Sequence, residues 1–287
     1  TIHAYPNGGG SFIVARDNLG AIPAQAAAAA LLTDYILTVA VSISSGTAQL
    51  VSAFPILYEY RVIIAVFLVL VIMVINLRGV KESGITFAIP TYFFLVMMFV
   101  TIIVGMIKLI LGTLGVVDSP PMDVIEMNQT IQPITAFLIL KAFASGTTAV
   151  TGVEAISDGI TAFKEPRTKN AGTTLIIMAF ILGTTMLAIT YLSHVVGVMP
   201  SEEETLISQL TRTIYENRGF LYIGTIASTT IILVMAANTA FADFPRLSAI
   251  AAADGYLPRQ FPYRGSRLVY SPGIVALACV AILRSIF

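Results

Sequence analysis

The sequence contains little charge, a single cysteine and no tryptophan. Only 11% of its 287 residues are Asp, Glu, Lys or Arg, whereas 56% are apolar, and the mean hydropathy is +0.87. Soluble domains carry about 25% charged residues, so a soluble enzyme, a nucleic-acid-binding protein and a disordered chain are excluded. The formal net charge of zero also leaves no field that would attract nucleic acid.

The scarcity of cysteine and histidine restricts the chemistry further. Cys279 alone excludes a disulfide framework and a multi-cysteine metal site, and it lies in an apolar run where packing is its expected role. Two histidines, His3 and His194, are too few for a metal cluster, and no nucleophile–base pair is apparent. We therefore expect neither an enzyme nor a resident cofactor. Thr1 at the start and an apolar stretch at the end suggest that both ends of a longer protein are cut.

Seven long apolar segments account for most of the chain. A bilayer core about 30 Å thick is crossed by about 20 apolar residues of helix, and in lipid the backbone must satisfy its own hydrogen bonds. Strand-like alternation is absent, so the sequence predicts an all-α integral membrane protein. The predicted spans are 21–45, 61–77, 84–111, 133–162, 171–199, 219–242 and 272–287.

Positive charge alternates from loop to loop. Lys or Arg precedes the first span, as Arg16, and returns after the second, fourth and sixth spans, whereas the loops after the first and third spans contain neither. The positive-inside rule then places residues 1–20 in the cytoplasm of a multi-pass plasma-membrane protein. The outer loop over 201–217 predicts a short surface helix, with Ser201 as N-cap and Glu204 completing a capping box. This helix is either a plain connector, which we favour, or a cap on an outer gate.

A polar face in the first span predicts a cation site. A carboxylate at the bilayer centre costs about 2.5–3.5 kcal/mol on insertion scales, and Asp34 lies near the middle of this span. Thr38 and Ser42 follow on nearly the same helix face, and Tyr35 flanks it. Such oxygen atoms can replace the hydration shell of an alkali cation. The alternatives are that Asp34 is protonated or pairs with Lys141.

A second polar stretch lies in the fourth span and centres on Glu154. Glycines around it weaken the helix and favour the local unwinding by which secondary transporters build binding sites at mid-membrane. Close helix packing is the alternative explanation for these glycines. Lys141, two turns into the same span, either extends to the membrane surface or neutralises a carboxylate. The residues that share the polar face are Thr147, Thr151, Glu154 and Asp158.

Three motifs, in the right order, resemble the amino acid–polyamine–cation (APC) superfamily. Residues 4–12 are similar to the Pro-Gly-Gly-aromatic segment before its helix three, residues 152–159 to its unwound helix six, and residues 254–258 to the turn after its helix eight. The resemblance implies a LeuT-like inverted-repeat (5+5) fold. It implies one permease domain over 1–287, truncated at both ends, with helices three to five in 1–111 and helices six to nine in 133–287.

The polar residues further resemble those of potassium importers related to the KUP uptake family. This implies secondary active import of potassium, coupled to protons, across the plasma membrane, and a homodimer of the full-length protein. An amino acid permease and a non-transporting membrane sensor or scaffold are the alternatives. The residues implied as ion or substrate ligands are Asp34, Tyr35, Thr38, Ser42, Thr151 and Glu154, of which Asp34, Thr38, Thr151 and Glu154 would hold the potassium ion. Thr147, Asp158 and Lys141 are the implied supporting residues.

Overall fold

The computed structural model is helical throughout the part of the chain that it describes, and that part contains no strand. Two compact units are present. The first unit consists of residues 1–30 and 125–187, and the second of residues 31–124 and 188–287. The described residues are 4–5, 10–79, 84–117, 134–147, 156, 160, 163–201, 203–216, 218–253, 255–263 and 269–286.

The first unit contains two short helices and the starts of two long ones. α1 covers Ser11–Leu19 and α6 covers Ala136–Thr147, while α2, Ala21–Ala53, and α8, Arg167–Val196, begin here and end in the second unit. The side chains of α6 are exposed from residue 136 to residue 146, although most are apolar. A surface of this kind is typical of a helix that meets lipid or a further helix rather than water.

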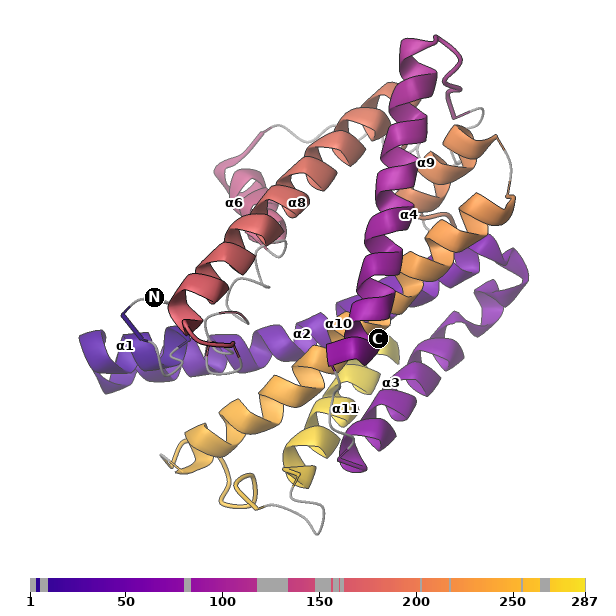
Figure 1. The fold of residues 1–287 in the computed structure, drawn as a ribbon. Helices are drawn as coiled ribbons and strands as arrows, with labels where there is room; N and C mark the ends of the chain where they lie inside the picture. The colour runs from indigo at the N-terminus through magenta and orange to yellow at the C-terminus, as the bar shows by residue number, and fades with distance from the viewer. Residues whose placement is uncertain are drawn as a thin grey trace. The chain divides into compact units, whose positions relative to one another are not determined.

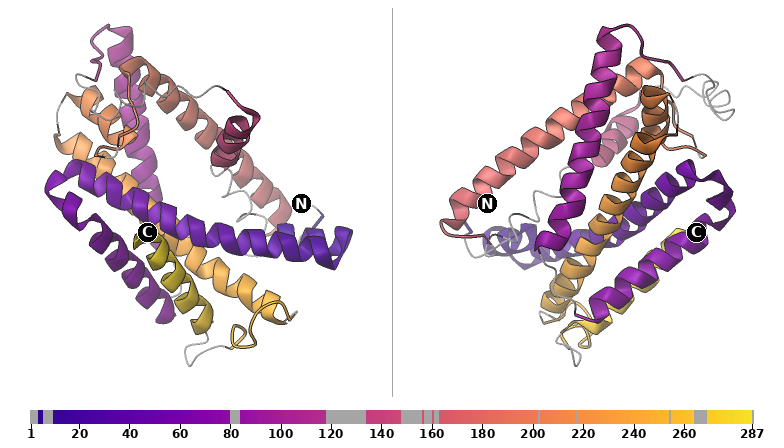
Figure 2. Two further views of the ribbon diagram at one scale, coloured as in Figure 1. Left: turned by 180° about the vertical axis from the view of Figure 1, so that it is seen from behind. Right: turned by 45° about the vertical axis from the view of Figure 1, so that its right-hand side comes forward.

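The second unit packs its helices around an apolar core. α3 and α11 run side by side, and both contact α10, as the views in Figure 1 and Figure 2 agree. On its other side α10 packs along α4 and meets α9. The elements of this unit, besides the ends of α2 and α8, are η1 (Pro55–Tyr60), α3 (Arg61–Leu77), α4 (Gly84–Ile110), α9 (Leu206–Tyr215), α10 (Phe220–Ala253) and α11 (Ser271–Ile286).

Small residues let these helices approach closely. Ala237, Ala240 and Ala278 are at most 2% exposed where α10 and α11 meet the core. At Gly273 of α11, a Cβ atom would lie 2.9 Å from the Cα atom of Pro245 in α10, so the contact is between backbones. Close van der Waals packing of small residues is the main attraction available to helices in lipid, and the composition of this core provides it.

Five helices in the described part of the chain are long and apolar enough to cross a membrane, and two further apolar helices, α6 and α11, are shorter. The seven segments predicted from the sequence therefore all contain helix, although two predicted ends are wrong. α2 continues to Ala53 instead of residue 45, and α10 continues to Ala253 instead of residue 242. Both extensions carry more polar or small residues than the predicted spans, but none of these residues stops the helix. Even Pro245 lies inside α10.

Two local predictions are wrong. α9 begins at Leu206, and its N-cap is Thr205, whose Oγ1 accepts a hydrogen bond from the Ser208 amide at 3.3 Å. Ser201, the predicted N-cap, instead accepts from the Glu203 amide in the preceding segment. Cys279 is exposed on α11 rather than packed, because the core face of that helix is taken by its neighbours Leu277, Ala278 and Ala281.

Candidate functional site

The described part of the predicted cation site lies on α2, in the second unit. Asp34 and Thr38 are half-buried, and Ser42, one turn further along, is 8% exposed. Because α2 is unbroken here, the three side chains keep the spacing that places them on nearly one face. They extend over about 12 Å of helix at 1.5 Å per residue. A carboxylate and two hydroxyls in such a row offer hard oxygen ligands suited to an alkali cation.

Tyr35 occupies a different position from its neighbour Asp34. Together with Leu32 and Ile36 it packs against the core of the second unit, next to the buried Val39. The Tyr35 ring therefore helps to fix the rotation of α2 about its own axis. Through that contact it can orient the Asp34 side chain as well as offer its hydroxyl.

The other predicted ligands belong to the first unit. Thr151, Glu154 and Asp158 lie outside the described residues, and Thr147 is the last residue of α6, where its side chain is not described. Lys141 is exposed on α6 and has no ion-pair partner within the described part of the chain. An exposed lysine agrees with extension of its ammonium group to the membrane surface.

A buried polar cluster fastens α9 to the ends of α2 and α10. The Thr205 amide donates to Ser52 Oγ, and Thr205 Oγ1 donates to Gln49 Oε1, both at 3.0 Å. The hydroxyls of Ser208 and Tyr222 lie 2.8 Å apart. Gln49, Ser52, Ser208 and Tyr222 are all buried, so their polar groups are matched with one another instead of with water. We refer to the cluster of Gln49, Ser52, Thr205, Ser208 and Tyr222 as the polar clasp.

Further contacts within and beside α9 hold this element against its neighbours. Glu204 accepts from the Arg212 guanidinium through both carboxylate oxygens, each at 3.1 Å, a geometry typical of strong arginine–carboxylate pairs. The Gln209 side chain donates to the Met199 carbonyl and accepts from the Met199 amide. Beneath them, Leu210 and Ile214 are fully buried against the end of α8.

The polar clasp was not predicted from the sequence, although one signal was present. Gln49 and Ser52 stand three residues apart in the last turns of an apolar helix, which places them on one face. Their partner Thr205 follows more than 150 residues later in the chain. A pattern within one helix can therefore indicate a buried polar face, but it does not identify the partner.

Two further polar contacts involve the last turns of α3 and the second half of α10. Asn76 of α3 donates to Asn238 of α10 at 2.7 Å. Asp243 and Arg246 form an ion pair at 3.8 Å on α10, at a spacing of three residues that places both side chains on one helix face. Both contacts join side chains to each other and indicate a structural role.

Comparison with known proteins identifies the family. The model of the family described as amino acid permease matches residues 2–287. The chain is a member of this family. The match confirms the resemblance to the APC superfamily and indicates a multi-pass protein of the plasma membrane. Family membership also points to transport rather than to an enzyme.

One relative carries a more specific description. The chain is 47% identical over 282 residues to the protein of Bacillus subtilis (strain 168) named potassium transporter KimA. The alignment covers 98% of this chain and 46% of that protein. The chain therefore spans about half the length of this relative.

Proposed function

We propose that the intact protein is a secondary transporter that imports potassium together with protons. The observation that carries the proposal is the row of Asp34, Thr38 and Ser42 along one side of α2. This row belongs to a permease that is similar, over nearly the whole chain, to a protein named as a potassium transporter.

In this proposal the oxygen atoms of α2 replace part of the hydration shell of the potassium ion. Asp34 supplies the charge, Thr38 and Ser42 supply neutral oxygen atoms, and Tyr35 holds the helix in register. Thr151 complements them from the fourth predicted span. Glu154 acts as the coupling group, since a mid-membrane carboxylate can carry a proton in one half of the cycle and face the ion in the other.

The proposal also includes the finer architecture implied by the sequence. The chain would supply helices three to nine of an inverted-repeat fold, and alternating access would move one bundle against the other around the ion. Glycines near Glu154 would allow the unwound stretch that such a site requires. Thr147, Asp158 and Lys141 would support the ligands, and the full-length protein would form a homodimer.

Amino acid transport is the second candidate, because it is the activity named in the description of the family. Such a substrate presents its own carboxylate to the protein. Two acidic side chains at mid-membrane, Asp34 and Glu154, would repel that carboxylate. They favour a bare cation as the substrate.

Uptake by the intact protein in proteoliposomes distinguishes the two candidates. Radioactive rubidium, as a substitute for potassium, and a mixture of amino acids are offered in parallel, with and without an inward proton gradient. The proposal predicts rubidium uptake that increases with the gradient and no amino acid uptake above that of protein-free vesicles. Amino acid uptake without rubidium uptake would refute the proposed substrate.

A further inference from the structure

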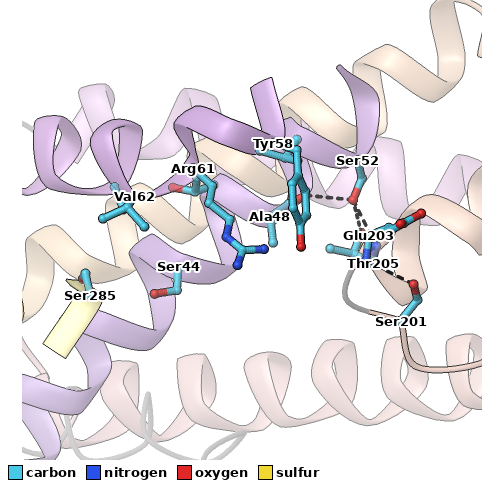
Figure 3. Close-up of a pocket in the computed structure, with 13 residues that line it drawn as sticks. Ser44, Ala48, Ser52, Tyr58, Arg61, Val62, Ser201, Glu203, Thr205 and Ser285 are labelled. Carbon is cyan, nitrogen blue, oxygen red and sulfur yellow. Dashed lines mark hydrogen bonds between the residues drawn. The ribbon is translucent and has the colours of Figure 1, made fainter. Parts of the chain in front are cut away.

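A pocket with several polar side chains in its wall lies in the second unit, and none of Asp34, Thr38 and Ser42 lines it. Its volume is about 220 Å³, and it opens where the end of α2 and η1 meet the start of α3. The segment before α9 and the last turn of α11 complete its wall. Figure 3 shows the side chains that enter it, among them Ser44, Tyr58, Arg61 and Ser285.

Arg61 gives the pocket a positive charge. The guanidinium carbon lies 4.4 Å from the centroid of the Tyr58 ring, a cation–π contact that holds the group in place. Within the described part of the chain, Arg61 has no ion-pair partner. Glu203 also lines the pocket, but in Figure 3 its carboxylate points away from the guanidinium.

Thr47 provides a second and independent indication of a ligand. Its side chain is only 3% exposed, and its hydroxyl lacks a hydrogen-bond partner among the described residues. A buried hydroxyl without a partner costs about 1–3 kcal/mol, so a group that accepts its hydrogen bond would be stabilised there. Ser44 also lines the site and offers a second hydroxyl, whereas the Ser285 hydroxyl donates to the Ala281 carbonyl at 2.9 Å. A guanidinium among hydroxyl donors suits an oxyanion, and phosphate oxygens match its planar fork.

Exposed apolar side chains near the pocket indicate that such a phosphate would belong to a membrane lipid. On the first turns of α3, Ile63 is 66% and Phe67 is 62% exposed, and on the last turn of α11 Ile286 is 52% exposed. These apolar side chains would face acyl chains. Arg and Tyr residues at the ends of spans lie at the level of lipid headgroups, which is where Tyr58 and Arg61 stand.

We propose that this pocket binds the phosphodiester group of a membrane phospholipid, with Arg61 and Thr47 as the principal donors and the acyl chains along α3 and α11. The site is separate from the proposed potassium site, so it can be tested whether or not the protein transports potassium.

The test is native mass spectrometry of the intact protein in detergent, titrated with phosphatidylglycerol. We expect Arg61→Gln to lower lipid retention about tenfold, the factor that corresponds to losing one hydrogen-bonded ion pair. Arg284→Gln is the matched control, because Arg284 is an exposed arginine in the last turn of α11 that does not line the pocket; retention should be unchanged. Thr47→Val should lower retention severalfold without loss of folding, since the hydroxyl it removes has no partner in the described protein.

Two further ligands identify the source of the phosphate. Diacylglycerol, which lacks the phosphodiester, should not be retained, and millimolar inorganic phosphate should not displace the lipid. Displacement by inorganic phosphate would overturn the proposal in favour of a site for free anions. Equal retention by Arg61→Gln, Arg284→Gln and the wild type would show that lipid binds without this pocket, and would overturn it as well.

Discussion

Two groups of polar side chains on α2 differ in how the protein surrounds them. Asp34 and Thr38, in the middle of the helix, are only half-buried. Gln49 and Ser52, near its end, are buried, and each has a hydrogen-bond partner in Thr205. The second group serves folding, since its polar groups are matched within the protein. Asp34 and Thr38 keep part of their surface exposed, which binding of an ion requires, although Ser42, the third residue of the row, is buried.

The largest effect that separates the two groups is expected from Asp34→Asn. Rubidium uptake by the intact protein should fall roughly 100-fold, which corresponds to about 2.7 kcal/mol of lost interaction with the ion. Thermal stability should be unchanged or higher, because a mid-membrane carboxylate costs about 2.5–3.5 kcal/mol and the amide carries no charge. Uptake in proteoliposomes and thermal unfolding followed by size-exclusion chromatography measure the two quantities. Normal uptake, or loss of folding, would place Asp34 with the structural group.

Thr205→Val tests the other group. It removes the N-cap of α9 and leaves the Gln49 side chain without its donor, so stability should fall by about 1–3 kcal/mol. The concentration of rubidium that gives half-maximal uptake should not change. Thr213→Val is the control, because the Thr213 hydroxyl donates only within α9, to the Gln209 carbonyl, and its removal should cost less. Equal losses of stability from Thr205→Val and Thr213→Val would show that the hydrogen bonds of the polar clasp do not stabilise the fold.

The same substitution at two places on α2 sharpens the contrast. Ser42→Ala should raise the half-saturating rubidium concentration about threefold to tenfold, as expected for one neutral ligand worth about 0.5–1.5 kcal/mol, and should leave the unfolding temperature nearly unchanged. Ser52→Ala should do the reverse, because Ser52 accepts from the Thr205 amide. If both variants changed both the half-saturating rubidium concentration and the unfolding temperature, the distinction between an ion-binding and a structural group on α2 would be lost.

The smallest effect is expected from Lys108→Gln. Lys108 pairs with Glu216 between α4 and the end of α9, and the Glu216 side chain is 68% exposed. An exposed pair of this kind contributes about 0–1 kcal/mol, and salt screens it. Unfolding temperatures of wild type and variant should differ slightly in low salt and converge in high salt. A large difference that persists in high salt would mean that this pair, and not the polar clasp, holds α9.

The sequence was sufficient to predict where helices lie, because long apolar segments in lipid have few alternatives to helix. It was less reliable at their ends. Residues 46–53 extend α2 although they include Gln49 and Ser52, because polar side chains do not stop a helix when another element satisfies them. In α9 the capping pattern at Ser201 looked favourable, but the backbone turns helical only after Thr205, which the polar clasp holds in place.

The candidate site could be predicted only where its pattern lies within one helix. The spacing of Asp34, Thr38 and Ser42 places them on one face of α2, and the structure has an unbroken helix there. The pocket at Arg61 depends instead on segments far apart in the chain, from Ser44 to Ser285. The exposure of Cys279 could not be predicted either, because periodicity alone did not reveal which face of α11 meets the core.

Coupling between potassium and protons is the central claim, and the pH inside proteoliposomes tests it most directly. The intact protein is reconstituted with a pH-sensitive dye trapped in the lumen, and an inward potassium gradient is imposed without a proton gradient, with permeant thiocyanate present to dissipate voltage. We predict that the lumen acidifies as potassium enters, and that Glu154→Gln and Asp34→Asn abolish this acidification. Potassium entry without acidification, or acidification that persists in Glu154→Gln, would contradict the claim.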